Sequence, residues 1–145
     1  MKHWFLDTNV LIDFLADRQP FAVAANDIFR LAYAGQVRLY VASLSFSTAF
    51  YLIRRSLAAT GAENPSLAAQ QLLARIKPLL TVVAVEDATV SQALQAGFPD
   101  FEGALQSFAA QSVPAVELLI TRNSKDFRLS SWPIAEPAAA LQNLP

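Results

Sequence analysis

Several features that the sequence lacks narrow its function before any motif is considered. It has no cysteine, which excludes disulfide bonds and thiolate zinc sites and is compatible with a reducing compartment. No glycine-rich loop is present that would cradle a nucleotide. No segment reaches the roughly 18 continuous apolar residues of a membrane span, and the first residues do not resemble a signal peptide. We therefore expect a cytoplasmic protein without a membrane partner.

The chain also lacks an excess of charge of either sign. Eleven basic residues nearly balance twelve acidic ones, so no overall positive field favours nonspecific binding of nucleic acid. Any contact with RNA must therefore depend on local clusters. Apolar residues, in contrast, are abundant: they make up 54% of 145 residues, which is enough for a sizeable buried core. We expect a single domain that spans residues 1–145.

Apolar residues follow two different spacings in turn, which predicts strands separated by helices. The predicted strands are residues 3–7, 38–42, 79–85, 116–121 and, at an edge, 132–134. The predicted helices are residues 8–16, 21–34, 66–77, 87–96, 100–110 and two segments that begin at residues 43 and 136. Strands joined through helices pair in parallel with right-handed crossovers. The expected class is α/β, with three α/β/α layers around a mainly parallel central sheet of four to five strands.

Asp7 directly follows the first predicted strand and precedes the first helix. Open α/β sheets usually bind ligands at the carboxyl ends of their strands. The loop after Thr121 emerges at this same edge, so Asp126 is expected near Asp7, and Asp100 and Glu102 at a helix start are placed to join them. Crowded carboxylates repel one another unless a cation neutralises them, and their oxygens suit Mg²⁺ or Mn²⁺. The sequence therefore predicts an acidic metal site.

A metal held in this way can supply hydroxide at neutral pH and stabilise charge on a phosphoryl group. Each acid also has a simpler structural interpretation. In this interpretation, Asp7 merely caps the following helix and Asp126 merely makes a turn. Asp100 and Glu102 are then ordinary helix-start acids. Asp13 is expected to be a solvated residue of the first helix.

Three stretches together resemble the PIN domain family, in the family's order and spacing and over nearly the whole chain. They are residues 5–13 (Phe-Leu-Asp-Thr-Asn-Val-Leu-Ile-Asp), 100–106 (Asp-Phe-Glu-Gly-Ala-Leu-Gln) and 120–127 (Ile-Thr-Arg-Asn-Ser-Lys-Asp-Phe). The resemblance is closest to bacterial PIN proteins of the VapC-like type. It implies a metal-dependent ribonuclease fold, a toxin role beside an antitoxin protein, RNA as substrate, and a homodimer.

The resemblance also implies roles for individual residues. Asp7 would be a metal ligand oriented by hydrogen bonds from Asn9, and Asp126 would close the acidic pocket as a further ligand. Asp100, as a catalytic residue and metal ligand, or Glu102, as a catalytic residue, would substitute for a missing acid only if the start of their helix shifts. The supporting polar residues would be Thr8, Asn9, Thr121 and Asn123. Apart from the resemblance, the loop position of Arg122 would aim its side chain at a substrate phosphate.

The sequence departs from the family pattern at two places. The central motif of this branch usually reads Asp-Phe-Glu-Asp, and Gly103 replaces its last acid, normally a principal metal ligand. The wider family has a glutamate in the helix after the second strand, whereas residues 43–48 contain no acid. Glu102 would not simply replace the missing acid, because one step along a helix turns a side chain by about 100°. We expect weak or lost nuclease activity; the alternative is an impaired PIN-like module that binds RNA or a protein partner.

Overall fold

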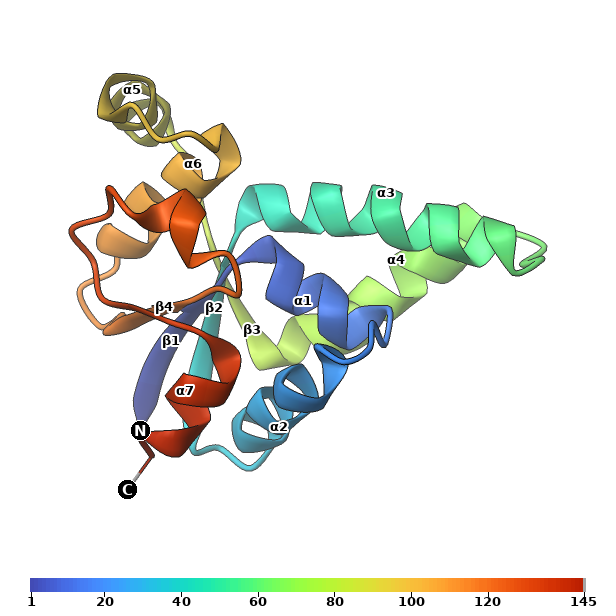
Figure 1. Ribbon diagram of the computed structural model, residues 1–145. Helices are drawn as coiled ribbons and strands as arrows, with labels where there is room; N and C mark the ends of the chain where they lie inside the picture. The colour runs from blue at the N-terminus through green and yellow to red at the C-terminus, as the bar shows by residue number, and fades with distance from the viewer. Residues whose placement is uncertain (145) are drawn as a thin grey trace.

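The computed structural model describes residues 1–144, which contain one five-stranded sheet (Figure 1). Pro145, the last residue of the expected domain, lies outside the described residues. The strands are β1 (Lys2–Leu6), β2 (Val37–Ala42), β3 (Leu80–Val83), β4 (Leu118–Ile120) and β5 (Ile134–Ala135). All neighbouring strands are parallel, in the order β3-β2-β1-β4-β5. The expected mainly parallel sheet is confirmed.

Seven α-helices and two 3₁₀ helices connect these strands within residues 1–144. They are α1 (Thr8–Leu15), α2 (Ala22–Tyr33), α3 (Ser43–Ala59), α4 (Pro65–Ile76), η1 (Lys77–Leu79), α5 (Asp87–Ala96), α6 (Phe101–Gln111), η2 (Ser124–Phe127) and α7 (Pro137–Gln142). Their positions agree closely with the predicted helices. The third strand is shorter than predicted at both ends: Leu79 belongs to η1, where Pro78 occupies one of the first helical positions, and the strand ends at Val83 rather than Val85. None of the helices in this part of the chain is long and apolar enough to cross a membrane.

Two apolar cores lie on opposite faces of the sheet. Along β1, Trp4 and Leu6 pack into one core and Phe5 into the other, because successive side chains of a strand point to opposite faces. The first core includes side chains of α1, α2, α3, α4 and α7, whereas the second includes side chains of α6 and η2. Helix α5 packs on α6, away from the sheet (Figure 1). The expected three-layer arrangement is confirmed.

The register of the central strands brings distant polar residues to the carboxyl edge of the sheet. Leu6 pairs with Ile120, so the residues that follow them, Asp7 and Thr121, are neighbours at this edge. The backbone N–H of Asp7 donates to the carbonyl oxygen of Ile120 at 2.9 Å. Helix α3 begins directly after β2, as α1 does one residue after β1. The starts of both helices therefore lie near Asp7.

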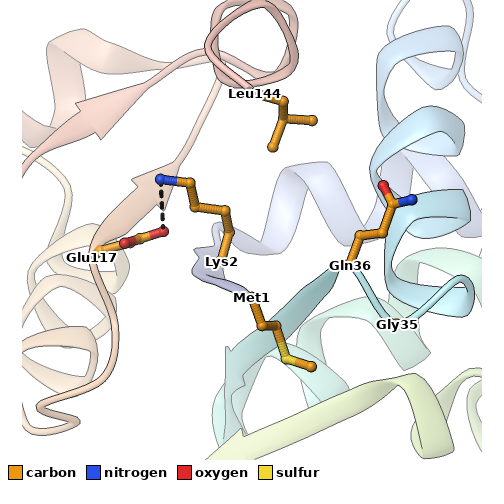
Figure 2. A pocket seen from close by; sticks show the side chains of 6 residues that line it. All are labelled: Met1, Lys2, Gly35, Gln36, Glu117 and Leu144. Carbon is orange, nitrogen blue, oxygen red and sulfur yellow. Dashed lines mark ion pairs between the residues drawn. The ribbon is translucent and has the colours of Figure 1, made fainter.

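A broad cavity of about 610 Å³ lies at the opposite, amino edge of the sheet (Figure 2). Its lining residues are Met1, Lys2, Gly35, Gln36, Glu117 and Leu144. Lys2 Nζ and Glu117 Oε1 are 3.8 Å apart there, and both side chains are well exposed to solvent. Parallel sheets bind ligands at the other edge. We therefore place the functional site at the carboxyl ends of the strands.

Candidate functional site

Asp7 is a buried carboxylate at the end of β1, with 4% of its surface exposed. It occupies the N-cap position of α1, with an extended backbone, but its side chain makes no cap hydrogen bond. Instead, Thr121 Oγ1 donates to Asp7 Oδ2 at 2.7 Å, and Gln106 Nε2 donates to Asp7 Oδ1 at 3.0 Å. Asp7 is therefore more than a helix cap, because its oxygens bind side chains of β4's following residue and of α6.

Thr8 links Asp7 to Glu102 and to the start of α3. The Thr8 backbone N–H donates to Gln106 Oε1 at 2.9 Å, and Thr8 Oγ1 donates to Glu102 Oε1 at 2.9 Å. Thr8 Oγ1 also lies 2.7 Å from Ser45 Oγ, which is fully buried. Since the single Thr8 hydroxyl proton goes to Glu102, Ser45 is the donor in that second contact. The three elements α1, α3 and α6 thus meet in one polar network.

The carboxylates at this edge influence one another. The pKa of Asp7 is raised above its ordinary value of 3.8, mainly by burial and further by the charge on Asp100. Hydrogen bonds from Thr121 and Gln106 oppose this shift and lower the pKa. Burial is also the main cause that raises the pKa of Glu102, and the charges on Asp100 and Asp7 add to it. Asp7, Asp100 and Glu102 therefore form one electrostatically coupled group, which we call the acidic site.

The raised pKa of Glu102 predicts how stability depends on pH. As the pH rises from 4.5, the ordinary pKa of a glutamate, through the raised pKa, the folded protein holds more protons than the unfolded chain. The free energy of unfolding therefore falls over this window. Glu102→Gln keeps an acceptor for Thr8 but cannot titrate, so we expect its stability to improve relative to the wild type with rising pH. Urea unfolding at a series of pH values measures this difference.

The matched control is Glu63→Gln, because Glu63 is an exposed glutamate before α4. This control should follow the wild type at every pH. A difference between Glu102→Gln and the wild type that stays constant, or shrinks as the pH rises, would contradict the electrostatic account of Glu102.

Asp100 lies at the start of α6, whereas Asp126 lies in η2. Asp100 is the N-cap of α6 and accepts a hydrogen bond from the Gly103 backbone N–H at 3.0 Å, as expected of a helix-start acid. Asp126 lies half-buried in η2, and within residues 1–144 it makes no side-chain hydrogen bond or ion pair with Asp7. The structure thus brings Asp7, Asp100 and Glu102 together but does not join Asp126 to them by direct contact.

The predicted supporting residues act in different ways. Thr121 binds Asp7 directly, and the backbone N–H of Asn123 donates to Thr121 Oγ1 at 3.0 Å. The backbone of Asn9 lies close enough to lower the pKa of Asp7, although it does not meet the geometry of a cap hydrogen bond. The side-chain oxygen of Asn9 accepts from Arg18 Nη2 at 3.4 Å instead.

The expectation that Asp13 is solvated is wrong. Asp13 is 1% exposed and lies between two arginines, with Arg18 Nη2 at 2.8 Å and Arg122 Nε at 2.8 Å from its carboxylate oxygens. The Arg122 guanidinium also stacks 4.0 Å from the centre of the Phe21 ring. Asp13 is buried because the loop after β4 and the loop after α1 both deliver a cation to it. The predicted contact of Arg122 with a substrate phosphate stays a prediction.

The chemistry of the donor set tests whether a divalent cation fits the acidic site. Carboxylate oxygens suit Mg²⁺ or Mn²⁺, and a cation would relieve the repulsion among Asp7, Asp100 and Glu102. Each oxygen of Asp7 accepts one hydrogen bond, which fixes its direction and leaves a lone pair for an ion. However, in the described part of the chain, no group of three or more His, Cys, Asp or Glu side chains is arranged to hold a metal ion. The carboxylates therefore supply oxygens of the right kind but, as arranged, not a complete set of ligands.

Gln106 and Ser45 are the polar residues of this site that the sequence interpretation missed. Both are buried, and each contacts the β1–α1 junction from another element. A signal for Gln106 is present in the sequence, because Gln106 follows Glu102 by four residues and so shares its helix face. No comparable periodic signal points to Ser45.

Comparisons with known proteins agree with this geometry. The model of the PIN domain matches residues 3–125, whereas no curated protein matches the sequence. A chain of VapBC2 from Rickettsia felis, solved with a DNA fragment from their promoter, aligns with a TM-score of 0.63 and 12% identity, covering 92% of this chain and 98% of that chain.

Two further solved structures share the fold. PAE2754 from Pyrobaculum aerophilum has a TM-score of 0.64 and 17% identity over 97% of this chain and 93% of its own. VapC20 from Mycobacterium tuberculosis, a sarcin-ricin loop cleaving toxin, has a TM-score of 0.55 and 16% identity over 80% of this chain and 86% of its own. At such identities the likeness establishes the fold, and the family follows from the match to residues 3–125. The protein belongs to the PIN domain family.

Proposed function

We propose that this protein is a PIN-type ribonuclease of low activity and the toxin of a VapC-like toxin–antitoxin pair. The observation that carries the proposal is the convergence of Asp7, Asp100 and Glu102 at the carboxyl edge of a PIN fold. Structural relatives support it, since one is a VapBC2 chain and another is a sarcin-ricin loop cleaving toxin. The proposal includes a single domain, an antitoxin protein as partner, and a homodimer.

The low activity follows from the charges and from the incomplete set of metal ligands. An anionic phosphodiester is repelled by three carboxylates unless a cation lies among them. The proposed cofactor is therefore Mg²⁺ or Mn²⁺, as the sequence predicted. Each oxygen of Asp7 accepts one hydrogen bond and keeps a lone pair for an ion, but Gly103 contributes no ligand. We expect weak ion binding and slow cleavage.

Restoring an acid at position 103 tests this explanation. A Cβ on Gly103 would lie 3.0 Å from Asp100 Oδ2 and 3.5 Å from Phe127 Cζ, so a new side chain starts beside the acidic site. The Asp100 carboxylate must shift by a few tenths of an ångström. We expect Gly103→Asp to cleave RNA about 10-fold faster than the wild type with Mn²⁺, because a further carboxylate strengthens ion binding. Single-turnover cleavage of a fluorescent RNA measures the rate.

Gly103→Asn is the matched control, because it introduces the same Cβ and a side chain of the same shape without the charge. Its rate should not exceed that of the wild type. If Gly103→Asp and Gly103→Asn cleave equally fast, the missing acid does not limit activity and the proposed explanation is wrong.

A second candidate function is a PIN-like module that binds RNA or a protein partner without cleavage. The absence of a side chain at Gly103, and of a group of three metal-binding side chains in the described part of the chain, favour it. Calorimetric titration with Mn²⁺ separates the two candidates. Binding that Asp7→Asn abolishes supports the nuclease, whereas a wild type that neither binds Mn²⁺ nor cleaves RNA supports the module.

A further inference from the structure

The Gln106 side chain bridges the acidic site and the backbone of α1. It projects from α6 and is 1% exposed. Its Nε2 lies 3.0 Å from Asp7 Oδ1, and its Oε1 lies 2.9 Å from the Thr8 backbone nitrogen. One amide therefore connects two consecutive residues at the start of α1 to a helix that lies about 100 positions later in the sequence.

The hydrogen-bond directions in this bridge are fixed by backbone groups. The Thr8 N–H can only donate, so the oxygen of Gln106 must face it and the NH₂ group must face Asp7. The Gln106 NH₂ group can only donate, so Asp7 Oδ1 must accept. On the other side, the Asn123 N–H donates to Thr121 Oγ1, which leaves the Thr121 proton for Asp7 Oδ2. Both oxygens of Asp7 are therefore held as acceptors.

Glu102 lies one helical turn before Gln106 and contacts the same residue of α1. Its Oε1 accepts from Thr8 Oγ1, while Gln106 Oε1 accepts from the Thr8 N–H. Two side chains of helix α6 therefore bind Thr8. Glu102 binds the Thr8 hydroxyl group, and Gln106 binds the Thr8 backbone N–H. A displacement of Gln106 would free the Asp7 carboxylate to rotate and would loosen the contact that keeps Glu102 beside it.

We propose that Gln106 is the positioning residue of the acidic site. Its amide sets the direction of the Asp7 carboxylate and keeps α6 aligned with α1. The expected effect of Gln106 on RNA cleavage rests on the proposed nuclease function. The two hydrogen bonds of the bridge do not depend on that function. Gln106→Met removes both hydrogen bonds at similar length, and Gln106→Glu replaces the donor that faces Asp7 with a carboxylate oxygen.

The first test observes the bridge without any assay of activity. In ¹⁵N-labelled full-length protein, the side-chain NH₂ of Gln106 is compared with that of Gln111, which lies on the same helix and donates to Ser107 Oγ. We expect the Gln106 NH₂ protons to exchange with water at least about 10-fold more slowly, because they are buried and bonded to a carboxylate. Asp7→Asn should shift the Gln106 NH₂ signals and leave those of Gln111 in place.

Gln106 NH₂ protons that exchange as fast as those of Gln111 would overturn the bridge, and this comparison needs no variant of the site. Gln106 signals that do not move in folded Asp7→Asn would overturn it as well. Thr121→Val, which removes only the hydrogen bond to Oδ2, is the second variant and should also shift the Gln106 signals through Asp7.

The second test measures RNA cleavage with Mn²⁺. We expect Gln106→Met to lower kcat about 10-fold with KM within about twofold, because misorientation of a carboxylate acts mainly on the transition state. Gln106→Glu should also lose activity, and the control Gln111→Met should match the wild type. Cleavage by Gln106→Met at the wild-type rate overturns the positioning role. A wild type that does not cleave RNA instead refutes the proposed function, and the NH₂ exchange still decides whether the bridge exists.

Discussion

Asp7→Asn is expected to lower RNA cleavage by at least about 100-fold and, at the same time, to raise the free energy of unfolding at neutral pH. Activity falls because the central charge of the acidic site is lost. Stability rises because burial raises the pKa of Asp7, so the ionised carboxylate costs free energy in the fold. That cost appears as the pH rises from 3.8 through the raised pKa. Single-turnover cleavage and urea unfolding measure the two effects.

The asparagine can be accommodated by the same partners. Its oxygen would accept from Gln106, and its NH₂ would face Thr121 Oγ1, which has a second lone pair beside the one used by Asn123. Asp27→Asn, on the surface of α2, is the control and should change neither property. Wild-type cleavage by Asp7→Asn, or a stability advantage that disappears with rising pH, would contradict this interpretation of Asp7.

Removal of the Asp13 carboxylate is the change with the largest expected cost in stability. Asp13→Ala leaves Arg18 and Arg122 without their shared partner, and the breaking of buried ion pairs of this kind costs about 3 to 5 kcal/mol. Both arginines are partly exposed, at 35% and 23% of their side chains, so water reduces the penalty. We expect a loss of about 2 to 3 kcal/mol, measured by urea unfolding.

The exposed pair of Arg30 and Asp27 provides the comparison. Its side chains are 80% and 46% exposed, so Asp27→Ala should cost less than about 0.5 kcal/mol. Arg122→Met should cost less than Asp13→Ala, because Arg18 still neutralises the buried carboxylate. Equal losses of stability for Asp13→Ala and Asp27→Ala would contradict this account. They would show that the ion pairs of Asp13 with Arg18 and Arg122 do not stabilise the contact between the β4 loop and α1.

Local spacing was sufficient to predict the helices and the parallel sheet, because each element carries its own apolar period. It also predicted that Asp7 and the loop after Thr121 emerge at the same edge, since parallel strands end there. Partners of buried polar groups were not predictable in this way. Gln106 and Asp7 are 99 positions apart, and Arg122 and Asp13 are 109 positions apart. Their contacts depend on the angle at which helices and loops cross, which no local pattern specifies.

The position of Asp126 depends on η2 as well as on the edge of the sheet. After Thr121 the chain turns into η2, and Phe127 is buried in the second core beside Gly103. The position of Asp126 is therefore constrained by the anchoring of Phe127, its neighbour in η2. Gly103 lies in the same region. A side chain at its position would face both the Phe127 ring and the Asp100 carboxylate.

Paramagnetic Mn²⁺ added in small amounts to ¹⁵N-labelled protein tests the central claim most directly, because it locates the cation independently of RNA cleavage. We expect the backbone signals of Asp7, Thr8 and Glu102 to broaden first, and Asp7→Asn to remove this broadening. Broadening that begins instead around a surface acid such as Asp27, or that persists unchanged in Asp7→Asn, would contradict the assignment of the acidic site.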